Sequence, residues 1–192
     1  MALWQSIPFA CILLPLGSAA MTSVLKGKFA RRWVFIVLTV VTALSACFTY
    51  FIWGYGESYT YMMGHFPAPW GNEIRGGLLE GITALFFSLI MLLSLLGGVK
   101  KLDDHVLHDK HSLYYVMILL LTAALMAQVY TNDAFTAYVF VEIMTISACS
   151  LIDARTKGRT LVAATRYMIM NLLGSGLFLL GVCILYGITG QL

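Results

Sequence analysis

Two apolar stretches decide the fold of this chain: residues 132–151, NDAFTAYVFVEIMTISACSL, and residues 160–186, TLVAATRYMIMNLLGSGLFLLGVCILY. Each is long enough to form a helix across the hydrocarbon core of a bilayer, which needs about 20 residues. The first stretch contains one carboxylate, Glu142, and the second contains one guanidinium, Arg166. Because a lone charge in lipid is costly, such residues usually face a protein interior and pair. We therefore expect Glu142 and Arg166 to contact each other.

The composition places the whole chain in the same class. Of its 192 residues, 60% are hydrophobic and 11% are charged, whereas soluble domains contain about 25% charged residues. The fold class predicted is all-α integral membrane, with residues 1–192 forming a single transmembrane helical domain. Apolar runs predict six transmembrane helices, at about residues 4–25, 33–53, 77–96, 113–130, 134–152 and 161–186.

The basic residues predict how these helices are oriented. Ten of the 12 Lys and Arg residues lie in three alternate loops: Lys26, Lys28, Arg31 and Arg32; Lys100, Lys101 and Lys110; and Arg155, Lys157 and Arg159. Loops rich in Lys and Arg face the cytoplasm. We therefore expect an inner (cytoplasmic) membrane protein with both termini outside. The net charge of +3 follows from this topology and gives no reason to expect a nucleic-acid partner.

One face of the fifth predicted helix is polar. Tyr138, Glu142, Thr145 and Cys149 are spaced by four, three and four residues, which places them on one side of a helix. Glu142 and Arg166 differ in depth by about 7 Å at helical rise, within reach of an extended arginine. A buried carboxylate whose pKa responds to a nearby cation suits proton transfer. The alternative is a static ion pair that locks the two helices together.

Further polar residues are candidates for a proton path or for packing. Gln128 lies near the outer end of the fourth helix, and Asn171 on the sixth is expected to bond to a neighbouring helix. His105, His108 and His111 are spaced by three and are candidates for proton collection at the membrane surface. A solvated loop that docks on a partner and a metal site are the alternatives. The spacing is not diagnostic of a metal, and no metal or cofactor is expected.

Three segments resemble one known family. FVEIMTISACSLI (140–152) and ATRYMIMNLLGSGLFLLGVCILYGITG (164–190) resemble the fifth and sixth helices of proton-translocating antiporter-like subunits. Respiratory complex I, Mrp-type sodium/proton antiporters and membrane-bound hydrogenases share these subunits. The loop FPAPWGNEI (66–74) resembles the D-type Mrp subunit in particular. The resemblance implies that Glu142 matches the family's helix-five glutamate, and that Arg166 matches a basic position on helix six.

The chain departs from this family in two ways. The family's basic residue on helix six is usually lysine, whereas an arginine such as Arg166 stays protonated, so it could tune Glu142 but not transfer protons itself. Family members also have about fourteen helices with inverted repeats, and six are predicted here. We expect a split or shortened subunit, with a fragment or a reduced relative as alternatives.

The expected function is that of a membrane subunit in a multisubunit complex that translocates protons, or exchanges sodium for protons. Its expected partners are other membrane subunits, including one that supplies the half-channel from helix seven onward, together with lipid and a cytoplasmic redox arm. The alternative is a non-conducting scaffold that packs other membrane subunits. No catalytic site is expected in the chain itself, because it lacks a cysteine cluster and a nucleotide motif.

Overall fold

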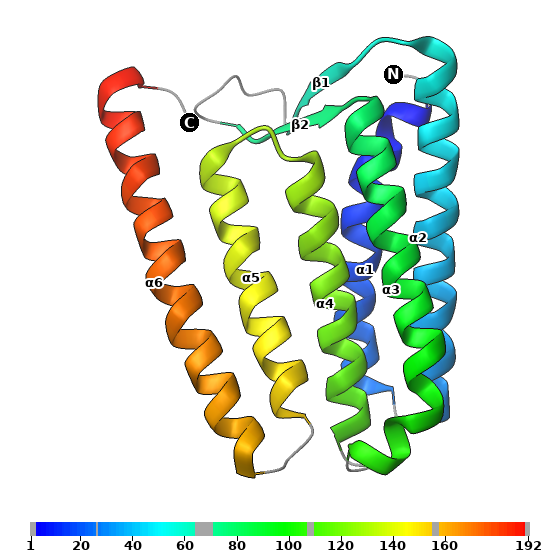
Figure 1. Ribbon diagram of the computed structural model, residues 1–192. Coiled ribbons are helices and arrows are strands. Elements are labelled where there is room, and N and C mark those ends of the chain that lie inside the picture. The colour runs from blue at the N-terminus through cyan, green and yellow to red at the C-terminus, as the bar shows by residue number, and fades with distance from the viewer. Residues whose placement is uncertain (1–2, 26, 64–70, 107–109, 155–157, 191–192) are drawn as a thin grey trace.

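The computed structural model describes residues 3–25, 27–63, 71–106, 110–154 and 158–190, and these form a bundle of six long helices (Figure 1). All six are long and apolar enough to cross a membrane, which confirms the predicted fold class. The elements are η1 (Leu3–Ser6), α1 (Ile7–Val24), α2 (Lys28–Tyr55), β1 (Tyr59–Met62), β2 (Glu73–Gly76), α3 (Leu78–His105), α4 (His111–Tyr130), α5 (Ala134–Asp153) and α6 (Gly158–Thr189).

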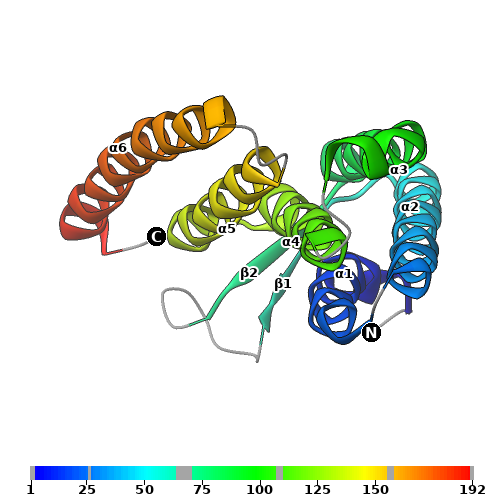
Figure 2. The ribbon, with the colours of Figure 1, turned by 90° about the horizontal axis from the view of Figure 1, so that it is seen from below.

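Four of the helices form a compact group, and the other two extend from it. Helix α1 packs against α2 and α4, and α3 packs against α2 and α4. Helix α5 then packs against α4, and α6 against α5, so that the last two helices project from the bundle when it is seen along its axis (Figure 2). The core therefore lies among α1–α4. There the rings of Phe48 and Tyr130, both fully buried, meet edge to face with centroids 5.8 Å apart.

The segment between α2 and α3 contains a hairpin, which the sequence did not predict. Strands β1 and β2 pair antiparallel, with Tyr59 opposite Gly76. A Cβ atom at Gly76 would lie 2.6 Å from the Tyr59 ring, so this pairing requires glycine. Residues 64–70, which include most of the proline-rich sequence, lie outside the described residues.

The hairpin joins three parts of the chain at one end of the bundle. The Tyr59 hydroxyl donates to the carbonyl of Gln5 in η1, at 3.0 Å. Burial raises the pKa of Tyr59, which keeps this hydroxyl a hydrogen-bond donor. From the α4–α5 loop, the backbone N–H of Asn132 donates to the carbonyl of Glu73 at 2.9 Å. The ends of α1, α4 and α5 on this side are thus fixed relative to one another.

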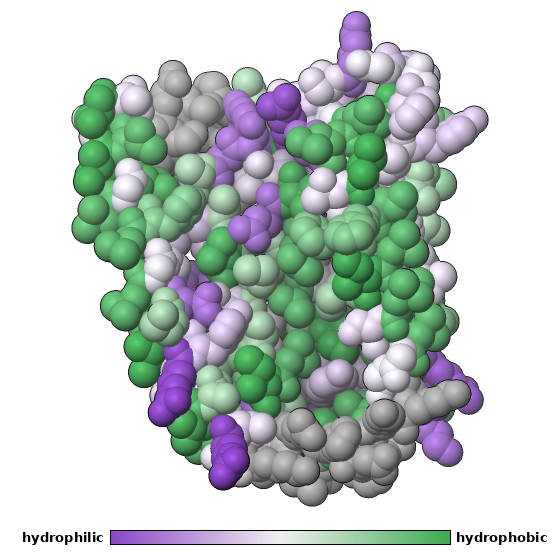
Figure 3. Space-filling view, in the orientation of Figure 1, coloured by the Kyte–Doolittle hydropathy of each residue, from purple (hydrophilic) through white to green (hydrophobic). Residues whose placement is uncertain are grey.

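Most of the described basic residues gather at the end opposite the hairpin, with Arg75 in β2 and Arg166 within α6 as exceptions. Lys28, Arg31 and Arg32 lie at the start of α2, Lys110 immediately before α4, and Arg159 at the start of α6. Helix α1 begins and α6 ends at the hairpin end (Figure 1). On the face that Figure 3 shows, hydrophobic side chains cover most of the surface between the two ends, with some polar patches among them. The alternation of loops matches the predicted pattern, while the side of the membrane that each end faces stays a prediction.

Candidate functional site

The candidate site is a pair of polar atoms inside α5. The Oε1 atom of Glu142 is buried and has no hydrogen-bond partner among the described residues, and the same is true of Oγ1 of Thr145, one turn further along. Thr145 is only 3% exposed. Buried polar atoms are nearly always paired, so two unpaired atoms on adjacent turns need an explanation in terms of water, an ion or a proton.

Helix α5 is held firmly enough to fix these two side chains. Asp133 caps its first turn, because its carboxylate accepts from the backbone N–H groups of Phe135 at 3.0 Å and Thr136 at 3.2 Å. At the other end, the thiol of Cys149 donates to the carbonyl of Ala164 in α6, at 3.4 Å. The face predicted from spacing therefore looks toward neighbouring helices, and α5 lies between α4 and α6.

The predicted contact between Glu142 and Arg166 is not made. Within the described residues, the ion pair is that of Arg75 with Glu80, at 3.4 Å near the hairpin, and Arg166 is exposed. The reason is the angle around α6. Ala164 is buried and its carbonyl accepts from Cys149, so this side of α6 faces α5, and two residues further along a helix is a rotation of about 200°. Similar depth in the membrane therefore does not bring the two side chains together.

The other residues predicted for a proton path or for packing have surroundings unlike those of Glu142 and Thr145. Tyr138 is half-buried on the α5 face, with its ring 6.3 Å from that of Phe135, and Gln128 is half-buried in α4. The Asn171 side-chain amide donates to the carbonyl of Tyr167, at 2.9 Å on its own helix. The prediction that Asn171 bonds to a neighbouring helix was wrong, because a carbonyl one turn earlier accepts the bond within α6.

The histidine cluster is described only in part. His111 is 7% exposed, and its Nε2 atom lies 3.0 Å from the carbonyl oxygen of Val106. Its ring is therefore buried and bonded and does not face water in this structure, and a place in proton collection stays a prediction. The side chain of His105 and the whole of His108 lie outside the described residues. Among the side chains that are described, no three His, Cys, Asp or Glu residues gather as a metal site would require.

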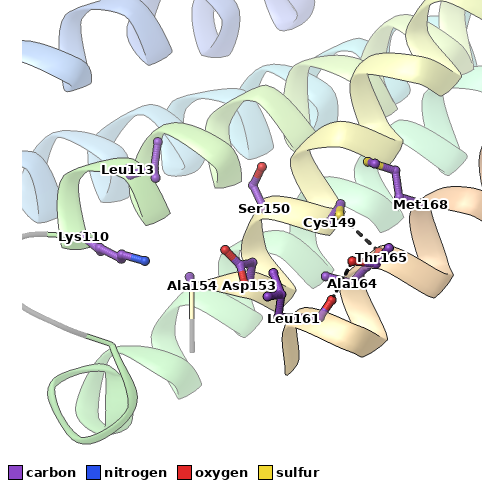
Figure 4. Close-up of a pocket in the computed structure, with 10 residues that line it drawn as sticks. All are labelled: Lys110, Leu113, Cys149, Ser150, Asp153, Ala154, Leu161, Ala164, Thr165 and Met168. Carbon is purple, nitrogen blue, oxygen red and sulfur yellow. Dashed lines mark hydrogen bonds between the residues drawn. The ribbon is translucent and has the colours of Figure 1, made fainter. Parts of the chain in front are cut away.

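A pocket that the sequence did not predict lies where α4 begins, α5 ends and α6 begins (Figure 4). Its volume is about 290 Å³, and both Lys110 and Asp153 line it. Asp153 follows Glu142 by eleven residues, or about 16 Å of helix, so the pocket is separate from the Glu142 site. In the sequence, the feature that could have indicated this pocket is one acidic residue, Asp153, at the end of an apolar run.

Comparison with known proteins gives consistent results. Residues 131–192 match the family model described as NADH:quinone oxidoreductase/Mrp antiporter, TM. The NADH-quinone oxidoreductase subunit N of Desulforudis audaxviator is 31% identical over 189 residues, covering 97% of this chain and 37% of that protein. The putative antiporter subunit mnhD2 of Staphylococcus haemolyticus is 30% identical over 185 residues, covering 94% of this chain and 36% of the relative.

Two solved structures share the fold. The membrane-bound sulfane sulfur reductase, an archaeal respiratory membrane complex, contains a chain that superposes with a TM-score of 0.88 at 26% identity, over 97% of this chain and 38% of that one. The Mrp complex from Dietzia sp. gives 0.85 at 22% identity, over 100% of this chain and 36% of that one, and shows likeness of fold alone. This chain spans a little over a third of the length of these curated relatives. By sequence and by fold, this chain is similar to the antiporter-like membrane subunits of NADH:quinone oxidoreductases and Mrp antiporters.

Proposed function

We propose that this chain is the part of a proton- or sodium/proton-translocating membrane complex in which Glu142 takes up and releases protons. The observation that supports this role is the unpartnered, buried Oε1 atom of Glu142. A carboxyl group accepts hydrogen bonds when it is ionised and donates one when it is protonated, so an oxygen without a partner can exchange a proton with water or with a group of a neighbouring subunit.

The hydroxyl of Thr145 supplies a second unpartnered atom on the same face of α5. A hydroxyl both donates and accepts hydrogen bonds, so it can pass a proton on through water toward or away from a carboxyl group. A static lock between α5 and α6 would instead need Glu142 to be engaged by Arg166, and that contact is absent from the described residues. The proton-transfer role is thus better supported than the lock.

Arg166 is proposed to act on Glu142 through its field and not through contact. It lies on α6, which packs directly against α5, and a guanidinium is a permanent cation in proteins. Arg166 is therefore assigned a tuning role, whereas Glu142 is the residue that changes its protonation state.

The relatives suggest the assembly in which the chain works. They are named as subunits of an NADH-quinone oxidoreductase and of antiporters. We place this chain beside other membrane subunits in the cytoplasmic membrane, with another polypeptide supplying the half-channel that begins at helix seven. In a redox-driven parent complex, a cytoplasmic redox arm completes the assembly.

The experiment that tests this role is Glu142→Gln in the assembled complex. Glutamine keeps the size of the side chain and removes the exchangeable proton, so proton transfer is expected to fall at least about tenfold while assembly persists. Transfer is measured with a pH-sensitive dye in inverted vesicles, and assembly by native electrophoresis. Glu57→Gln is the matched control, because Glu57 is exposed at the hairpin end.

The result that would contradict the proposal is equally specific. Normal proton transfer by Glu142→Gln, with normal assembly, would exclude Glu142 as a proton carrier and leave the scaffold alternative. Loss of assembly in Glu142→Gln, but not in Glu57→Gln, would show that the carboxyl group has a structural role.

A further inference from the structure

The pocket between α4, α5 and α6 contains one positive and one negative side chain. Lys110 lies immediately before α4 and Asp153 is the last residue of α5, and both are half-buried. Their charged ends point toward the same space (Figure 4). They are not joined by an ion pair in the described part of the chain. The pocket therefore offers an ammonium and a carboxylate to a ligand that bears both opposite charges.

The remaining walls of the pocket are mostly apolar and open outward, and the hydroxyls of Ser150 and Thr165 are bonded within their own helices. Leu113, Leu161 and Met168 line it and are 49%, 60% and 46% exposed. Leu161 and Met168 are seven residues apart, so they share one face of α6. They form an apolar track, interrupted by Thr165, that leads from the charged end of the pocket along the spanning part of α6. This combination of charge at one end and an apolar track beyond it suits an amphiphile.

The position of the pocket along the helices supports the same reading. Lys110 and Asp153 lie at the ends of the candidate spans His111–Tyr130 and Ala134–Asp153. Charged side chains at the ends of membrane spans lie at the level of the lipid headgroups. Met168 lies ten residues into the span Gly158–Thr189, about 15 Å along the helix and so at the level of the acyl chains.

We infer that this pocket binds one phospholipid with an ethanolamine-type headgroup. Lys110 donates to the phosphate, Asp153 accepts from the primary ammonium, and an acyl chain lies along Leu161 and Met168. An anionic headgroup would be repelled by Asp153 and would leave it unpaired. A choline headgroup carries no N–H and cannot donate to a carboxylate, whereas a primary ammonium forms charge-assisted hydrogen bonds. The inference is independent of the proton-transfer role of Glu142.

The test is photo-crosslinking in the assembled complex, reconstituted in vesicles of phosphatidylethanolamine and phosphatidylglycerol. Photoactivatable lipids with ethanolamine, choline or glycerol headgroups are compared, and the crosslinked peptides are identified by mass spectrometry. The ethanolamine probe is expected to label the peptide containing residues 161–168 selectively. Lys110→Gln and Asp153→Asn should each lower that labelling about three- to tenfold, the scale of one charge-assisted hydrogen bond.

Lys28→Gln is the matched control, because Lys28 is exposed at the same end of the bundle but does not line the pocket. Equal labelling by all three probes would show ordinary surrounding lipid and would overturn the inference. So would labelling that neither pocket variant changes. A photoreactive amino acid at Leu161 that links to another polypeptide segment, and not to lipid, would also overturn it.

Discussion

At Glu142, the physical problem is one buried carboxylate oxygen, Oε1, without a hydrogen-bond donor among the described residues. Buried polar atoms are nearly always paired, so this oxygen needs a partner such as water or a group of a neighbouring subunit. A carboxyl oxygen that bonds to water can exchange a proton with it, whereas one held by fixed donors cannot do so as readily.

Thr145 provides a prediction at the residue scale that separates proton transfer from packing. Thr145→Val removes the hydroxyl but keeps a branched side chain of similar shape, and we expect it to slow proton transfer. Because Oγ1 has no described partner, the loss of this hydroxyl should change the free energy of unfolding by less than about 1 kcal/mol. Dye-based transfer and denaturant titration in mixed micelles measure the two effects.

Thr145→Ser is the matched variant, since it restores the hydroxyl without the methyl group. Serine at this position should recover most of the transfer activity that valine loses. Equal activity in the valine and serine variants would show that the hydroxyl takes no part in proton movement.

Arg166 and Asn171 show where reasoning from the sequence fails at this scale. Spacing along α5 correctly placed Glu142 and Thr145 on one face, because a single helix fixes the angle between its own residues. The relation between two helices also depends on how each is rotated about its axis. That rotation directs Ala164 toward α5 and leaves Arg166 exposed. Asn171 similarly bonds within its own helix.

At the scale of the element, Asp133 determines where α5 begins. Its carboxylate accepts from Phe135 N and Thr136 N, and from the Thr136 hydroxyl as well. Asp133→Ala should lower the free energy of unfolding by about 1 kcal/mol, the usual cost of losing an N-cap. Asp133→Asn, which retains a capping oxygen, should lose much less. Denaturant titration in mixed micelles distinguishes the two, and equal losses would exclude capping as the cause.

The hairpin provides a second prediction for a single element. A Cβ atom at residue 76 would meet the Tyr59 ring, which is held by its bond to Gln5 and by an edge contact with Trp4. Gly76→Ala should therefore lower the free energy of unfolding by about 1–3 kcal/mol, as overpacking does. Gly54→Ala is the control, because the space around Gly54 is open. Thermal unfolding followed by circular dichroism compares them, and equal midpoints would contradict the pairing of Tyr59 with Gly76.

The sequence predicted the helices far better than it predicted the hairpin. Apolar runs of about 20 residues have few alternatives in a membrane, because backbone groups in lipid must be satisfied within a helix or a closed barrel. Short strands such as β1 and β2 depend on contacts with distant residues. The bond from Asn132 to Glu73 and the bridge between Ile74 and Thr131 join segments that are far apart in the sequence.

At the scale of the whole molecule, the two ends of the bundle differ in structure and in positive charge. One end has the hairpin, which joins η1 to the α4–α5 loop. The other has the described basic residues at the starts of α2, α4 and α6, together with the pocket between Lys110 and Asp153. Lys and Arg are retained on the cytoplasmic side when short loops are inserted into a membrane. The basic end is therefore expected to face the cytoplasm, and the hairpin end the outside.

Cysteine labelling in intact cells tests this orientation. In a variant whose four native cysteines are replaced by alanine, Glu57→Cys at the hairpin end should react with a membrane-impermeant maleimide, since Glu57 is exposed. Gly158→Cys, exposed at the basic end, should react only after the cells are opened. Labelling of Gly158→Cys before opening, with protection of Glu57→Cys, would reverse the orientation. The pocket of Lys110 and Asp153 would then face the outer leaflet, and the ethanolamine lipid inferred for it would have to come from there.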